Sequence, residues 1–262
     1  KYRDVPDGIV AYYNALSNHV VMYEQSKLTE VAPELAFKQA VSTIAHEGVH
    51  QILHNIGVQQ RLSRWPIWFS EGLAEYFAPT ELDRRVRWKG VGLVNDLRLY
   101  ELSEFYKSHG NRSTSGQLIR RAVDTPTLDS LGYATSWAIV HYLARHERDK
   151  FNSCLQEASR LGPLEGLPDG SLFGKNVSRD HAQFEDELIA HLQSLPYVNP
   201  VLNQTHYLMM IQNDKREIVI TSSPKELKKQ IEKHAGKHRY QVQAFPDRFQ
   251  AELFGQAWLR AK

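Results

Sequence analysis

The chain has 262 residues, which is long enough for one large domain or two modest ones. Apolar residues make up 42% of it and charged residues 24%, which is ordinary globular usage and excludes a disordered or fibrous protein. The formal net charge is only +2, so we expect no nucleic-acid partner. No stretch approaches the roughly 20 apolar residues of a membrane span. A single cysteine excludes a disulfide framework and a thiolate-rich metal site.

The first 80 residues predict a hairpin followed by two helices. Residues 8–24 alternate β-prone side chains around a polar interruption, which indicates two strands joined by a turn. After Pro33, apolar residues recur at helical spacing as far as Ile56, which predicts a long and mostly buried helix. Pro66 suits the first turn of a second helix, which Pro79 helps to close.

The rest of the chain predicts a helical core and a separate small unit. Residues 81–131 are mixed, and helices are expected over 133–146 and near 150–160 and 181–194. A linker then precedes the pattern strand, strand, helix, strand, helix. We therefore expect an α+β fold, with a mainly helical catalytic domain over 1–200 that carries an N-terminal β-hairpin or small sheet, and a small α+β domain over 205–262.

Two histidines lie in the middle of the first predicted helix. His46 and His50 are four residues apart, so both imidazoles project from nearly the same face and can bind one cation. Glu47 follows His46, an offset that directs its carboxylate toward the water that a metal activates. A catalytic zinc needs a third protein ligand, for which Glu71 on the second helix is the best candidate. Glu75 lies one turn later, so one carboxylate can ligate while the other orients a histidine.

The segments AHEGVHQILH and WFSEGLAEYF together resemble the signature of the gluzincin metallopeptidases, the peptidase MA-like (HExxH…E) superfamily of aminopeptidase N-like and thermolysin-like enzymes. The chain looks closest to an uncharacterised aminopeptidase-like branch. The resemblance implies one Zn²⁺ ion bound by His46, His50 and Glu71, with Glu47 as general base. It also implies that Glu75 is an outer carboxylate behind a histidine ligand, as in thermolysin-like proteins.

Two further residues enter through the same resemblance. Ser70 corresponds to another position just outside the ligands. The segment YATSWAIVHYL looks like the aminopeptidase segment whose leading tyrosine stabilises the oxyanion, which gives that role to Tyr133; the alternative is an aromatic side chain packed into the core at a helix start. The resemblance covers about residues 8–150. The Gly-Ala-Met-Glu-Asn segment with which aminopeptidases capture an amino terminus is missing, so their specificity is not implied.

Other metal chemistries fit the residues less well. The metzincin pattern requires glycine and histidine where the chain has Leu53 and Ile56. A carboxylate-bridged di-iron bundle requires a second Glu-x-x-His copy, which the sequence lacks. These comparisons favour a single metal ion.

The residues thus predict a zinc metallopeptidase (a hydrolase) that acts on a peptide or protein substrate. The alternatives are a catalytically inactive, zinc-containing binding or scaffold protein and a metal-free helical scaffold. Basic residues outnumber acidic ones over 205–262, which suits an acidic partner, although a solvated lysine-rich helix face is the simpler interpretation. Because the sequence starts at Lys1 rather than methionine, we expect export to the periplasm, the cell envelope or the medium, although an arbitrary boundary would look the same.

Overall fold

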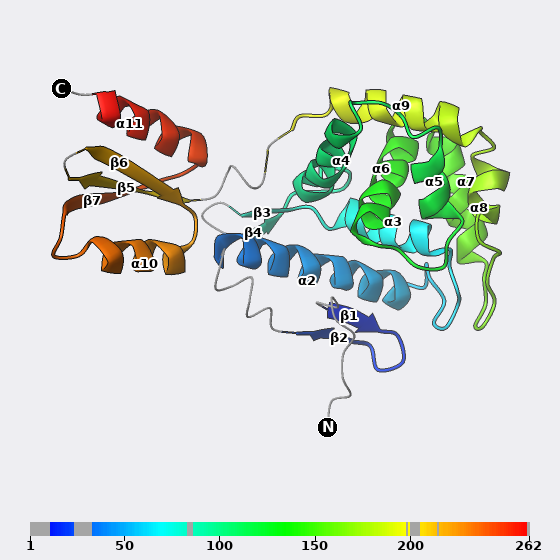
Figure 1. The fold of residues 1–262 in the computed structure, drawn as a ribbon. Coiled ribbons are helices and arrows are strands. Elements are labelled where there is room, and N and C mark those ends of the chain that lie inside the picture. The colour runs from blue at the N-terminus through cyan, green and yellow to red at the C-terminus, as the bar shows by residue number, and fades with distance from the viewer. Residues whose placement is uncertain are drawn as a thin grey trace. The chain divides into compact units, whose positions relative to one another are not determined.

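A computed structural model describes residues 11–23, 33–82, 86–197, 199, 205–213 and 215–260. Its elements in chain order (Figure 1) are β1 (Ala11–Asn14), β2 (His19–Met22), α2 (Pro33–Asn55), α3 (Ile67–Phe77), β3 (Thr80–Leu82), β4 (Val86–Trp88), α4 (Asp96–Ser108), α5 (Gln117–Val123), α6 (Ser130–His146), α7 (Arg148–Ser159), α8 (Ser171–Asn176), α9 (His181–Ser194), β5 (His206–Gln212), β6 (Arg216–Thr221), α10 (Pro224–His234), β7 (Arg239–Phe245) and α11 (Arg248–Arg260). The predicted α+β fold with a mainly helical core is confirmed. Among the described residues, no helix has both the length and the apolar character that crossing a bilayer requires.

Contacts between residues divide the chain into two compact units. The first holds residues 1–23 and 41–197, and the second holds residues 24–40 and 198–262. The domain bounds expected from the sequence, 1–200 and 205–262, stay predictions. The linker expected around 195–205 lies largely outside the described residues.

The core of the first unit is built around α3 and α6, which lie side by side in Figure 1. The exposed fraction of Trp68, Phe69 and Leu73 on α3 is at most 1%, and Trp137 on α6 is fully buried. A side chain at Gly72 would meet the backbone oxygen of Ser136 on α6 at 2.6 Å. The two helices approach this closely because residue 72 has no Cβ. The close approach also fixes the position of Glu71, the preceding residue on α3.

The hairpin of β1 and β2 has the predicted form. Its strands are antiparallel, and Asn18 takes a left-handed conformation (φ 58°) at the end of the turn. The Oδ1 atom of Asn14 accepts backbone N–H bonds from Leu16 and Ser17, both at 3.0 Å, which is typical of an Asx turn. Gln51 on α2 donates to the carbonyl of Asn18 at 2.7 Å, so the hairpin is bound to α2.

The long predicted helix is present as α2, but the expectation that it is mostly buried is wrong. Phe37, Ile44, Ile52 and Ile56 are each more than half exposed, whereas Leu53 is only 8% exposed. The spacing of apolar residues predicts a helix. It does not predict which face of that helix packs against the core when polar residues occupy part of the buried face. The buried stripe here holds the two histidines of the HExxH motif and Leu53.

Two buried polar networks bind α9 to the rest of the first unit. The Glu185 carboxylate is fully buried and accepts hydrogen bonds from the backbone of Gly116 at 2.7 Å and the hydroxyl of Thr114 at 2.8 Å. His191 Nε2 lies 2.8 Å from His141 Nδ1, and both rings are at least 94% buried. Because His141 Nε2 faces the carbonyl of residue 92, its Nδ1 is the acceptor in this pair and the His191 N–H is the donor.

The second unit contains a three-stranded antiparallel sheet in the order β6-β5-β7, with α10 and α11 on opposite sides of it in Figure 1. The central strand β5 is buried on both faces: Leu208 and Met210 pack with Ala251 of α11, while Met209 and Ile211 point to the opposite face. The predicted order of strands and helices in this unit is confirmed.

Candidate metal centre

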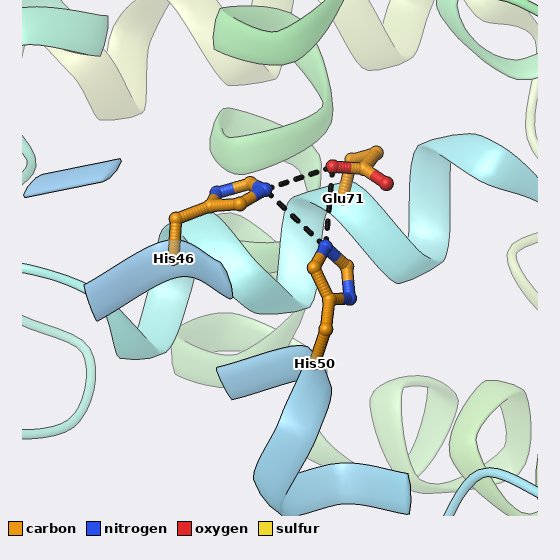
Figure 2. Close-up of side chains that lie close together, drawn as sticks. All are labelled: His46, His50 and Glu71. Atoms are coloured by element: carbon orange, nitrogen blue, oxygen red, sulfur yellow. Dashed lines mark hydrogen bonds and ion pairs between the residues drawn. The ribbon is translucent and has the colours of Figure 1, made fainter. Parts of the chain in front are cut away.

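Three side chains from two helices converge at one point. Figure 2 shows His46 and His50 of α2 facing Glu71 of α3. The Nε2 atom of His46 lies 2.9 Å from Glu71 Oε2 and 3.3 Å from His50 Nε2, and His50 Nε2 lies 3.4 Å from the same carboxylate oxygen. Among the described residues, these three form a group that could hold a metal ion.

The donor atoms match a tetrahedral metal site in type and spacing. Two imidazole nitrogens and one carboxylate oxygen are typical ligands of a catalytic transition metal. Ligand atoms at the roughly 2.0–2.1 Å bond lengths of zinc lie about 3.3–3.4 Å apart in a tetrahedron. The observed separations of 2.9, 3.3 and 3.4 Å agree within a few tenths of an ångström, so the side chains need little rearrangement to bind an ion.

The neighbouring carboxylates favour a proton on His46 when no metal ion is bound. Burial alone would lower the pKa of His46, but the neighbouring carboxylates of Glu75 and Glu71 outweigh burial and raise this pKa to about 10. The pKa of Glu71 is lowered despite its burial, because the imidazoles of His46 and His50 stabilise its anion. His46 Nε2–H therefore donates to Glu71 at neutral pH, and a metal ion must displace this proton to bind.

Glu47 lies beside the ligands without being one of them. Its side chain belongs to the HExxH turn of α2 and is 8% exposed. Burial raises the pKa of Glu47 above its ordinary value, although the His46 and His50 charges and a backbone N–H of Tyr13 on β1 act in the opposite direction. The structure thus places a buried carboxylate of raised pKa next to the group that could hold a metal.

Glu75 lies behind His46, on the side away from Glu71. Its Oε1 atom is 3.2 Å from His46 Nδ1, an ion-pair distance without the alignment of a hydrogen bond. Arg98 Nη2 donates to the same oxygen at 2.6 Å, and Asn95 Nδ2 donates to Oε2 at 2.8 Å. Burial opposes ionisation of Glu75, but Arg98 and His46 outweigh it and lower its pKa to about 2. Glu75 is therefore an anion that contacts one ligand.

The two remaining predicted residues lie near the group in different ways. Tyr133, in the first turn of α6, has its ring centroid 6.1 Å from that of His46. Burial and the neighbouring carboxylates of Glu71 and Glu47 raise the pKa of Tyr133, so its hydroxyl stays protonated at neutral pH. Ser70 is 9% exposed on α3, and within the described part of the chain none of its hydrogen bonds reaches the three ligands. The roles of both residues stay predictions.

Sequence reasoning missed Asn95 and Arg98. Both belong to a region whose pattern gave no functional signal. An Asn-Asp pair before an amphipathic stretch is an N-cap signal that locates the start of α4. That signal is purely local, so it could not show that the same turn reaches a carboxylate on α3.

The comparisons with known proteins concern the segment that carries this site. No curated protein and no solved structure matches the chain. Over residues 40–165, which include every residue of the candidate metal centre, the chain is similar to a family described as a protein of unknown function (DUF1570).

Proposed function

We propose that the protein is a zinc-dependent peptidase of the gluzincin kind. The observation that carries this proposal is the convergence of His46, His50 and Glu71 at separations suited to zinc, with Glu47 buried beside them on the same helix. The likeness of AHEGVHQILH and WFSEGLAEYF to the gluzincin signature supports the same assignment. The proposed substrate is a peptide or protein.

The two imidazoles and the Glu71 carboxylate would hold one zinc ion and leave a position open for reactants. When bound, zinc supplies a Lewis acid that polarises the scissile carbonyl and makes water easier to deprotonate. The choice of zinc over other divalent metals rests on two imidazoles and one carboxylate, the ligand set of many zinc peptidases.

Glu47 is the proposed general base. It accepts a proton from the attacking water and then returns this proton to the leaving amine. Burial raises its pKa, which makes its carboxylate a stronger base than an exposed glutamate. The charges of His46 and His50 act in the opposite direction and favour the anion of Glu47.

Tyr133 is the proposed hydrogen-bond donor to the oxyanion. A phenol of raised pKa remains a donor throughout the neutral range, and its ring lies beside that of His46. Catalysis in this proposal therefore uses three helices: α2 supplies the base, α3 the third ligand and α6 the oxyanion donor.

The test compares the parent protein with Glu47→Gln in zinc binding and in cleavage of a broad peptide library. The variant should bind one zinc ion about as tightly as the parent, because residue 47 is not a ligand. Its hydrolysis should fall on the order of 10²- to 10⁴-fold, since it lacks the base. Glu104→Gln, an exposed change on α4, is the matched control and should keep parental activity.

Each negative result has a distinct meaning. A Glu47→Gln protein that cleaves at the parental rate would refute the role of Glu47. A zinc-loaded parent that cleaves nothing in the library would refute the peptidase and favour the zinc-containing binding protein. A folded parent that binds no zinc would refute the metal centre itself.

A further inference from the structure

The first turn of α4 and its N-cap residue supply hydrogen-bond donors to Glu75, the carboxylate behind His46. Glu75 is 4% exposed, and both of its oxygens have partners on that turn: Arg98 donates to Oε1 at 2.6 Å and Asn95 to Oε2 at 2.8 Å. Oε1 is also the atom that lies 3.2 Å from His46 Nδ1. The carboxylate is thus held from one side by α4 while it contacts the metal-ligand candidate on the other.

The residues of this turn are themselves fixed. Asn95 is the N-cap of α4, and its Oδ1 accepts the backbone N–H of Arg98 at 3.3 Å, which leaves its Nδ2 directed at Glu75. The Arg98 guanidinium also donates through Nη1 to Glu101 at 2.9 Å and lies 5.4 Å from the ring centroid of Tyr133. A planar guanidinium with several contacts of this kind has one well-defined orientation.

We propose that Asn95 and Arg98 are positioning residues of the metal centre, which act through Glu75 to fix the ring of His46. The proposal rests on the proposed function, because it assigns these residues a role only if the site binds zinc. A ligating histidine binds best when its second nitrogen faces a fixed acceptor, which sets both the tautomer and the ring orientation. Here Oε1 of Glu75 faces that nitrogen at 3.2 Å, and the donors of α4 keep the carboxylate from turning away.

The charges of the site support the same role. Glu71 and Glu75 both contact His46, and the side chain of Glu75 is only 5% exposed. Arg98 supplies a cation against Glu75, and its own side chain is 17% exposed. Without Arg98, Oε1 of Glu75 would lose the donor at 2.6 Å that fixes it, and the carboxylate could turn away from Nδ1 of His46.

A purely structural role makes a different prediction. If Arg98 only stabilised the fold, its loss would weaken zinc binding equally whether or not Glu75 is present. If it acts through Glu75, its loss should have no further effect once Glu75 has been removed. A double-mutant cycle separates the two cases, because coupling appears only between residues that act on each other.

The experiment measures zinc affinity of the full chain by competition with a chromophoric chelator. The variants are Arg98→Met and Asn95→Ser, each in the parent and in a Glu75→Ala background. Serine keeps an N-capping oxygen while it removes the Nδ2 donor. Arg121→Met is the matched control, because it breaks an exposed ion pair, Arg121 with Asp129 at 2.6 Å, outside this network.

We expect Arg98→Met and Asn95→Ser each to weaken zinc binding on the order of 10-fold in the parent, and by less than about 2-fold in the Glu75→Ala background. Arg121→Met should stay within about 2-fold of the parent. Equal losses in both backgrounds, or variants that bind zinc as tightly as the parent, would overturn the inference. If Arg98→Met does not fold, the zinc affinity of Asn95→Ser is compared in the parent and in the Glu75→Ala background instead.

The proposed function and this inference fail in different ways. A folded parent that binds no zinc removes the metal centre, and the inference with it. A parent that binds zinc, with variants that show no coupling to Glu75, removes only the role given to α4.

Discussion

Removing the charge of Glu75 should change the titration of His46 in the metal-free protein. Glu75 Oε1 lies 3.2 Å from His46 Nδ1. Two unit charges at this distance attract by about 5 kcal/mol at an effective dielectric constant of about 20, and one pH unit corresponds to about 1.4 kcal/mol. Glu75→Gln should therefore lower the pKa of His46 from about 10 by about 3 or more. Glu71 still contacts Nε2 at 2.9 Å and favours the protonated ring.

The assay is NMR of the His46 imidazole nitrogens during a pH titration of metal-free protein. Glu101→Gln is the matched control: Glu101 contacts Arg98 rather than His46, so the pKa of His46 should hardly move. A His46 ring that is neutral by pH 8 in the parent would contradict the reasoning. So would a titration of His46 that is unchanged in Glu75→Gln.

The same pKa predicts how the stability of the metal-free protein depends on pH. Burial lowers the pKa of His46, but the carboxylates raise it to about 10, above its ordinary value of 6.5. The folded state therefore holds a proton that the unfolded chain releases. This contribution to the free energy of unfolding is present below pH 6.5 and is lost as the pH rises through about 10. Urea unfolding between pH 7 and 10 should show a shallower decline for Glu75→Gln than for the parent.

Two further predictions concern the polar networks around α9. Glu185→Gln should lower the free energy of unfolding by about 2–4 kcal/mol in urea titrations, because it replaces a buried carboxylate that accepts several hydrogen bonds. A loss under about 1 kcal/mol would contradict a stabilising role for this carboxylate. Burial first, and then neighbouring cations, lower the pKa values of His141 and His191 to about 4, so the unfolded chain takes up protons before the folded one as the pH falls. Stability present above pH 6.5 should then decline by on the order of 1.4 kcal/mol per pH unit for each histidine between pH 6.5 and 5; an equal slope in His191→Phe would contradict this assignment.

The elements of the fold could be predicted from the sequence wherever a local signal decides them. The hairpin follows from β-prone residues around a turn, and the bounds of α3 follow from Pro66 and Pro79. The order of elements in residues 206–260 follows from the same kind of local pattern. Each of these signals acts within one or two turns of the chain, so no knowledge of packing is needed to recognise it.

The shared direction of His46 and His50 is likewise a local property, because helix geometry places residues i and i+4 on one face whatever the rest of the chain does. Which face of α2 meets the core was decided by tertiary packing, and the structure leaves Ile44 and Ile52 exposed while it buries the histidines. Tertiary packing also decided the hydrogen-bond network of Glu75, Asn95 and Arg98 behind His46. Asn95 lies 20 residues from Glu75 in sequence, and only the packing of α4 against its neighbours brings the two side chains together. The spacing of residues along a helix determines the directions of their side chains on that helix. Contact between helices depends on how the surfaces of all the helices pack together.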